Sequence, residues 1–298
     1  MTPFQIRDAI KSHLDAWDGF WTEEEIWRHM HNTQQNLVRK ISQTDPSFFV
    51  ATADITITSG TDLYALPNNA RLGSLIIQTE DRTNSNSGEL GHAKLREYFR
   101  SKGITSNAEQ AEWALQGRNL RMLPAQSGVG SIRVWYVPTY GNMIQGKVIS
   151  ATSTTVVGFE SPNWTNNFGW VDPRDDYYND MEIFIVSGPG EGQLFKISDY
   201  SVSDSVPTFT IDGTFSPLPT AESEFAVMSP VPEDHHDVIA AGGALAGTAK
   251  NRNRQDELRF LYYGHPGSPG LYHDMLSWVS ERVEAEIDTV QPIDLGLF

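Results

Sequence analysis

Residues 54–72 read DITITSGTDLYALPNNARL, and this stretch introduces β-structure directly after the helical start of the chain. Two alternating runs, DITIT and DLYAL, flank the short break SGT. Alternation with β-branched and aromatic residues is typical of strands, and a short break with glycine between two such runs predicts a β-hairpin. Pro67 has no amide hydrogen to donate to a neighbouring strand, so pairing should end there. We expect the turn and core of this hairpin to consist of Gly60, Tyr64, Leu66 and Pro67.

The composition is that of a globular protein that works without cysteine chemistry. Of 298 residues, 39% are hydrophobic and none is cysteine, which excludes disulfides, thiolate zinc sites and cysteine nucleophiles. The net charge of -16 argues against a surface that binds the phosphates of nucleic acids. An acidic protein can nevertheless lie close to DNA, which it repels. Acidity can equally serve solubility alone. We expect no membrane contact, because the sequence has neither a long apolar run nor the start of a signal peptide.

Two amphipathic helices are predicted to open the chain. Thr2 with Gln5, and Thr22 with Glu25, have the spacing of capping boxes. Asp45-Pro46 then ends the second helix, because the residue before a proline is disfavoured in the helical conformation.

Strands follow up to about Pro138. WALQGRNLRMLP predicts a second hairpin around Gly117, and SIRVWYVP predicts a further strand. The alternation in these segments predicts a small, mostly antiparallel sheet with one face packed on helices.

The stretch from about 142 to 230 differs in composition from the rest. It holds twelve acidic and three basic residues, so it carries about -9 of the net charge. Six successive runs predict strands: KVISAT, TTVVGF, MEIFIVS, GQLFKISDY, TFTIDG and EFAVMS. Without a helical period, an all-β sandwich or barrel is expected. We therefore predict an α+β fold: a discontinuous core, 1–141 and 231–298, of bundled helices with a small antiparallel sheet, and an inserted β domain, 142–230.

Helices are predicted to return after Pro232, starting with PEDHHDVIAAGGALAGTAKNR. Each glycine weakens this helix by roughly 1 kcal/mol relative to alanine, so close packing is expected on its small-residue face. A last helix is predicted over LYHDMLSWVSERVEAEIDTV, followed by the apolar end QPIDLGLF.

No enzyme signature emerges from the sequence. It lacks GxxxxGK[ST], GxSxG and HExxH, and the glycine-rich residues 188–192 precede a predicted strand, so they fit a hairpin turn and not a phosphate loop. The aspartates of DPRDDYYND, residues 172–180, fit a solvated acidic loop better than a calcium loop. The paired histidines His29/His31 and His235/His236 point apart on a helix, so structural or surface roles are favoured over metal binding. We expect no catalytic site, metal or cofactor.

Several segments together resemble one known family. They are WTEEEIWRHMHNTQQNLVRKI, DPSFFVATADITITSGTDLYALPNNARLGSLI with a G-x-x-x-Y-x-LP pattern, AEWALQGRNLRMLPAQ, IRVWYVP and PEDHHDVIAAGGALAGTAK. In this order and spacing the chain resembles the phage adaptor proteins, the head-to-tail connectors of tailed bacteriophages. The resemblance covers about 1–141 and 231–298. Residues 142–230 depart from minimal members and are similar to β modules inserted in phage neck and tail proteins.

The resemblance implies a structural virion protein of the neck, made in the host cytoplasm and without enzyme activity. Such proteins form a ring, usually a dodecamer, beneath the portal protein, extend the DNA channel without sequence-specific binding, and provide the docking platform for tail or nozzle proteins. For packing between subunits the residues expected are Gly242, Gly243, Leu245 and Gly247. For docking to the portal they are Ile293, Leu295, Leu297 and Phe298.

Two other functions stay open. In the first, the β module of a tail or neck component binds carbohydrate through Trp164, Trp170, Tyr177 and Tyr178. In the second, the protein is a cell-wall hydrolase, a muramidase, with Glu160 or Glu191 as the acid, although nothing in their spacing selects them.

Overall fold

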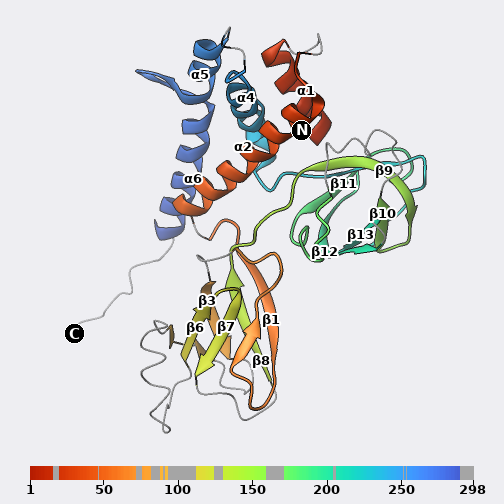
Figure 1. The fold of residues 1–298 in the computed structure, drawn as a ribbon, viewed down its shortest axis with the longest axis vertical. Coiled ribbons are helices and arrows are strands. Elements are labelled where there is room, and N and C mark those ends of the chain that lie inside the picture. Colours follow the sequence, from red (N-terminus) through yellow and green to blue (C-terminus); the bar gives the residue numbers. More distant parts are fainter. Residues whose placement is uncertain are drawn as a thin grey trace, which may run out of the picture. The chain divides into compact units, whose positions relative to one another are not determined.

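The computed structural model describes residues 1–15, 20–45, 47–71, 76–81, 88–89, 91–92, 112–123, 130–158, 171–203, 206–250, 252 and 254–288. These residues form helices packed together, small sheets and a closed barrel (Figure 1). The predicted fold class, α+β with an all-β module, is confirmed.

The chain divides into two compact units. One unit comprises 1–48, 140–173 and 181–298, and therefore holds both the helices and the barrel; the other comprises 49–139 and 174–180. That 142–230 is a domain that folds by itself stays a prediction.

The helices that the structure describes belong to the first unit. They are α1 Pro3–Leu14, α2 Glu23–Thr44, the 3-10 turn η1 Glu233–His235, α4 His236–Gly247, α5 Gln255–Tyr263 and α6 Leu271–Asp288. Both predicted capping boxes are present, because the hydroxyls of Thr2 and Thr22 accept from the amides of Gln5 and Glu25. None of the described helices is both long and apolar enough to cross a membrane.

Helix α4 lies at the centre of the helical packing, where it contacts α1, α2 and α5. Its glycines permit this approach: a methyl group added at Gly242 would lie 2.7 Å from Thr33 Cγ2, and one at Gly243 would lie 2.7 Å from Ile10 Cδ1. Gly247 lies equally close to Leu14, whereas Leu245 is partly exposed. The expected close packing is therefore present within one chain. A contact of these residues with another subunit stays a prediction.

Replacing Gly242 by leucine is expected to lower the free energy of unfolding by about 1–3 kcal/mol, the usual cost of overpacking. The new side chain would meet both Thr33 and the Tyr262 ring, whose Cε2 lies 2.8 Å from a Cβ at this position. Urea unfolding measures the change. Ala246→Leu is the control, because Ala246 is exposed on the same helix. Equal midpoints for the two variants would mean that α4 does not need the glycine.

The barrel contains all six strands predicted for the acidic stretch. They are β9 Ile144–Ala151, β10 Thr155–Gly158, β11 Glu182–Ser187, β12 Leu194–Ser203, β13 Val206–Ile211 and β14 Glu224–Val227. Antiparallel pairing in the order β10-β13-β12-β11-β14-β9 closes on itself, so of the two expected architectures the barrel is the one formed.

The interior of the barrel is filled by side chains, as expected for a small barrel. The Phe209 ring lies 5.2 Å from that of Tyr200 and 5.5 Å from that of Phe225. Gly158 makes room for Phe225, because a Cβ there would lie 2.6 Å from Cζ of that ring. The Tyr200 hydroxyl donates to the carbonyl of Asp172, which satisfies its polar end. The barrel is therefore a packed core.

The second unit is built from two sheets. One has the order β1-β8-β3-β4 and the other β2-β7-β6-β5. The strands are β1 Ala51–Ile57, β2 Leu63–Ala65, β3 Ile76–Asp81, β4 Gly88–Glu89, β5 Gly91–His92, β6 Glu112–Gln116, β7 Asn119–Leu123 and β8 Gly130–Tyr136. All described pairs are antiparallel except β5 with β6.

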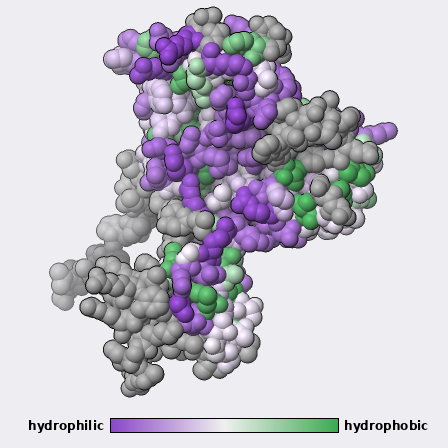
Figure 2. Space-filling view, viewed as in Figure 1, coloured by the Kyte–Doolittle hydropathy of each residue, from purple (hydrophilic) through white to green (hydrophobic). Residues whose placement is uncertain are grey.

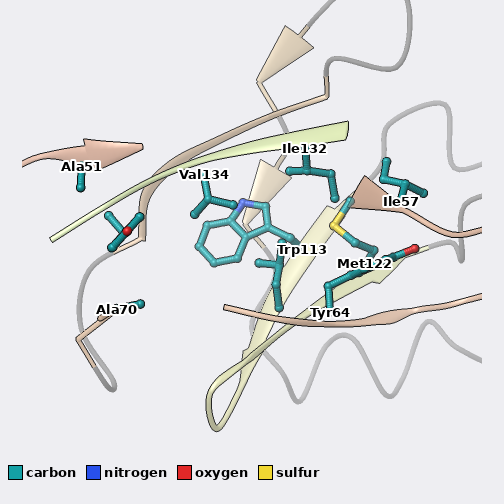
Figure 3. Close-up of a cluster of buried hydrophobic side chains, with 10 residues drawn as sticks. Ala51, Ile57, Tyr64, Ala70, Trp113, Met122, Ile132 and Val134 are labelled. Atoms are coloured by element: carbon teal, nitrogen blue, oxygen red, sulfur yellow. The ribbon is translucent and has the colours of Figure 1, made fainter. Parts of the chain in front are cut away.

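The buried cluster of this unit takes side chains from both sheets. Ile132 and Val134 come from β8, and Trp113 and Met122 come from the other sheet (Figure 3). The apolar faces therefore pack on each other, and the prediction that one face packs on helices is wrong. The alternation in the sequence shows that a face is buried but not what covers it.

The predicted hairpin in 54–72 is also wrong, although both of its strands exist. Strand β1 pairs with β8, and β2 pairs with β7 in the other sheet. The loop between them turns at Gly60, where φ is +79°, a conformation that suits glycine. Tyr64 is buried in the cluster between the two sheets, and Leu66 is partly buried against it. Both residues are therefore core residues as predicted, but the core lies between two sheets and not within a hairpin. After Pro67 the chain leaves β7, as predicted, and the hairpin around Gly117 is confirmed by the pairing of β6 with β7.

Candidate interaction surface

Part of the predicted site lies outside the described residues. This holds for the portal-docking residues Ile293, Leu295, Leu297 and Phe298, and for Glu160, Trp164 and Trp170. Their roles stay predictions.

Three residues of the carbohydrate and hydrolase hypotheses, Tyr177, Tyr178 and Glu191, lie within the described ranges. Tyr178 is fully buried, so its ring cannot stack on a sugar, and the Arg174 guanidinium lies 4.0 Å from the Tyr177 ring centre. Glu191 is exposed in the turn between β11 and β12, and not in the apolar surroundings that a catalytic acid of this class occupies.

The acidic loop before Met181 is held by amide groups. Asn68 and Asn179 donate to the Asp176 carboxylate over 3.3 and 3.1 Å, and Asn69 donates to Asp180 over 3.5 Å. Within the described ranges, no three His, Cys, Asp or Glu side chains gather where they would hold a metal ion. These aspartates therefore anchor a loop, a role that the sequence analysis did not foresee.

Of the paired histidines, His236 has a structural position. It is buried at the start of α4, and its Nε2 donates to the carbonyl of Val231 over 2.9 Å. Burial lowers the pKa of His236, because the charged ring would lose its hydration. The ring is therefore a buried part of the helical packing.

Helix α5 exposes an unusual number of large apolar side chains. Only Leu258 and Tyr262 of this helix are buried. Phe260 is 54% exposed and Tyr263 is 48% exposed, and both lie beside the exposed Arg259. We call these three residues the α5 face. Large aromatic side chains with an arginine are the composition of protein interfaces.

The α5 face is concave. A hollow of about 550 Å³ is lined by Arg259, Phe260, Tyr263 and Gly264. Helix α5 ends at Gly264, with φ of +88°, and the short strands β15 Gly264–His265 and β16 Ser268–Pro269 turn the chain into α6. Tyr272 at the start of α6 stacks on Tyr262 at 5.3 Å and packs edge-on against Tyr263 at 5.8 Å. The Tyr263 ring is therefore held in place although half of it is in solvent.

Charge near the α5 face is unusual for so acidic a chain. Lys250, Arg252, Arg254 and Arg259 fall within ten residues. Lys250 pairs with Glu25 and Arg254 with Glu257. Arg252 and Arg259 form no ion pair with any residue that the structure describes. The surface therefore offers positive charge next to exposed rings.

A second exposed apolar surface lies where two barrel loops meet. Gln193 donates to the carbonyls of Gly190 and Pro217, each over 2.9 Å, and the Ser223 hydroxyl donates to the carbonyl of Pro189 over 2.7 Å. The joined loops carry the exposed residues Glu191, Leu194, Leu218 and Glu222, which we call the barrel tip. Residues 188–194 and 214–223 contain no lysine or arginine.

Figure 2 shows hydrophilic residues over much of this side of the molecule, with separate hydrophobic patches among them. Comparison with protein-family models finds no match, and comparison with curated proteins finds no relative. The α5 face and the barrel tip are thus identified from geometry alone. The sequence analysis missed both, although the apolar residues of QDELRFLYY outnumber those that one helix face can bury.

Proposed function

We propose that this protein is a structural virion component, a head-to-tail adaptor that assembles as a ring under a portal and receives the tail. The proposal rests on the order of motifs that resemble the phage adaptor proteins. The observation that supports it most is the α5 face, where exposed aromatic rings line a hollow together with Arg259, which has no ion pair among the described residues. A subunit of a ring needs such a surface, because it must bind neighbours on two sides.

The acidic charge is consistent with this role. A net charge of -16 on each copy repels DNA, so a genome can slide past a ring of such subunits without being held. No catalytic step is part of the proposal.

The mass of the purified chain, alone and mixed with the portal protein of the same genome, tests the function. We expect a closed ring on the portal, either formed beforehand or assembled from single chains by the portal as a template. Analytical ultracentrifugation and native mass spectrometry distinguish these two cases. A chain that stays monomeric and ignores the portal would rule out the adaptor function.

A further inference from the structure

We propose that the α5 face of one copy binds the barrel tip of the next copy, and that this head-to-tail contact closes the ring. The inference rests on the proposed function, which requires a ring, and adds the two surfaces that build it.

Much of the α5 face is exposed to solvent. Phe260 and Tyr263 expose about half of their surfaces, and Arg259 beside them has no ion pair among the described residues. The hollow between these side chains has room for an aliphatic side chain, and Arg259 at its edge attracts a carboxylate. The hollow therefore suits a ligand that has an apolar side chain with acidic residues beside it.

The barrel tip has that chemistry. Leu194 is 49% exposed and Leu218 is 46% exposed, and the acidic Glu191 and Glu222 are exposed on the same two loops. The hydrogen bonds of Gln193 and Ser223 hold the loops together, so little conformational freedom is lost when the tip binds. Neither loop has a lysine or arginine that would oppose the attraction of Glu191 and Glu222 to Arg259.

A second copy is favoured as the occupant because both complementary surfaces belong to one chain. Copies with a net charge of -16 repel each other on average, so a contact is favoured where arginines without an ion pair among the described residues, Arg252 and Arg259, are exposed. The two surfaces are different, so each copy uses one of them toward each neighbour. Contacts of this heterologous kind produce closed rings when the rotation between subunits allows it.

Two variants of the full chain test the contact. The α5 variant is Arg259→Glu with Phe260→Ser, and the tip variant is Glu191→Lys with Leu218→Ser. All four residues are exposed, so both variants are expected to fold, which circular dichroism checks. Ile149→Ser is the matched control, because Ile149 is an exposed apolar residue of the barrel outside the tip.

We expect each variant alone to fail to form rings, with association at least tenfold weaker than that of the wild type, while the control forms rings normally. Mixing the two variants is the decisive step. The intact tip of the α5 variant can bind the intact α5 face of the tip variant, and the two remaining surfaces are damaged. The mixture should therefore give a dimer containing one copy of each variant and nothing larger.

The outcomes separate this inference from the proposed function. Wild-type-like rings from either variant, on or off the portal, overturn the contact and leave the adaptor function standing. Variants that close rings but bind the portal more weakly assign the mutated surface to the portal, which also overturns the contact. Rings that depend on both surfaces but ignore the portal support the contact and overturn the adaptor function. A wild-type chain that stays monomeric under every condition overturns both.

Discussion

Replacing Phe209 by alanine is expected to lower the free energy of unfolding by about 3–5 kcal/mol, the largest effect that we expect of a single substitution in the barrel. Phe209 has no exposed surface, and its ring lies between those of Tyr200 and Phe225. The six strands form a closed barrel, whose backbone cannot easily move into the space that the Phe209 side chain would leave. The cost therefore includes a cavity as well as the lost burial of the ring.

Urea unfolding followed by circular dichroism measures the total change, and hydrogen exchange of peptides from 144–227 locates it in the barrel. Thr210→Ala is the control, since Thr210 neighbours Phe209 on β13 and is not one of the buried residues. An effect below about 1 kcal/mol for Phe209→Ala would mean that the barrel interior can repack around the loss.

The strands of the barrel could be predicted because their local signals agree with the fold. Alternating β-branched and aromatic residues lie between glycine-containing turns, and Gly188, Gly190 and Gly192 all adopt positive φ in the turn before β12. The capping boxes of α1 and α2 were equally visible, because they depend on residues only three positions apart.

The pairing of strands could not be predicted from the same signals. Strands β1 and β2 are near in sequence, yet their partners β8 and β7 lie more than fifty residues further along. Period-two alternation fixes which side of a strand is buried, but the choice of partner depends on long-range packing. The small-residue face of α4 raises the same problem, because close packing was evident but its partners, such as Ile10 and Thr33, were not.

Replacing Tyr64 by alanine is expected to lower the free energy of unfolding by about 2–5 kcal/mol. The ring is buried in the cluster between the two sheets, with Trp113 and Met122 among its members (Figure 3). The hydroxyl donates to the carbonyls of Thr58, over 3.1 Å, and Thr61, over 2.8 Å. The Tyr64 side chain therefore packs in the core and also fixes, through its hydroxyl, the loop that leads from one sheet to the other.

Tyr64→Phe separates these two contributions, because it keeps the ring and removes only the hydroxyl. We expect it to cost about 0.5–1.5 kcal/mol, and hydrogen exchange of residues 58–62 should rise in both variants, since both free this loop. If Tyr64→Ala unfolds at the same urea concentration as the wild type, Tyr64 is not part of the core. If Tyr64→Phe lowers the free energy of unfolding as much as Tyr64→Ala does, the hydrogen bonds to the loop contribute more to stability than the burial of the ring. Strand β2 has only three residues, Leu63–Ala65, and few hydrogen bonds to β7, so we expect the ring to dominate.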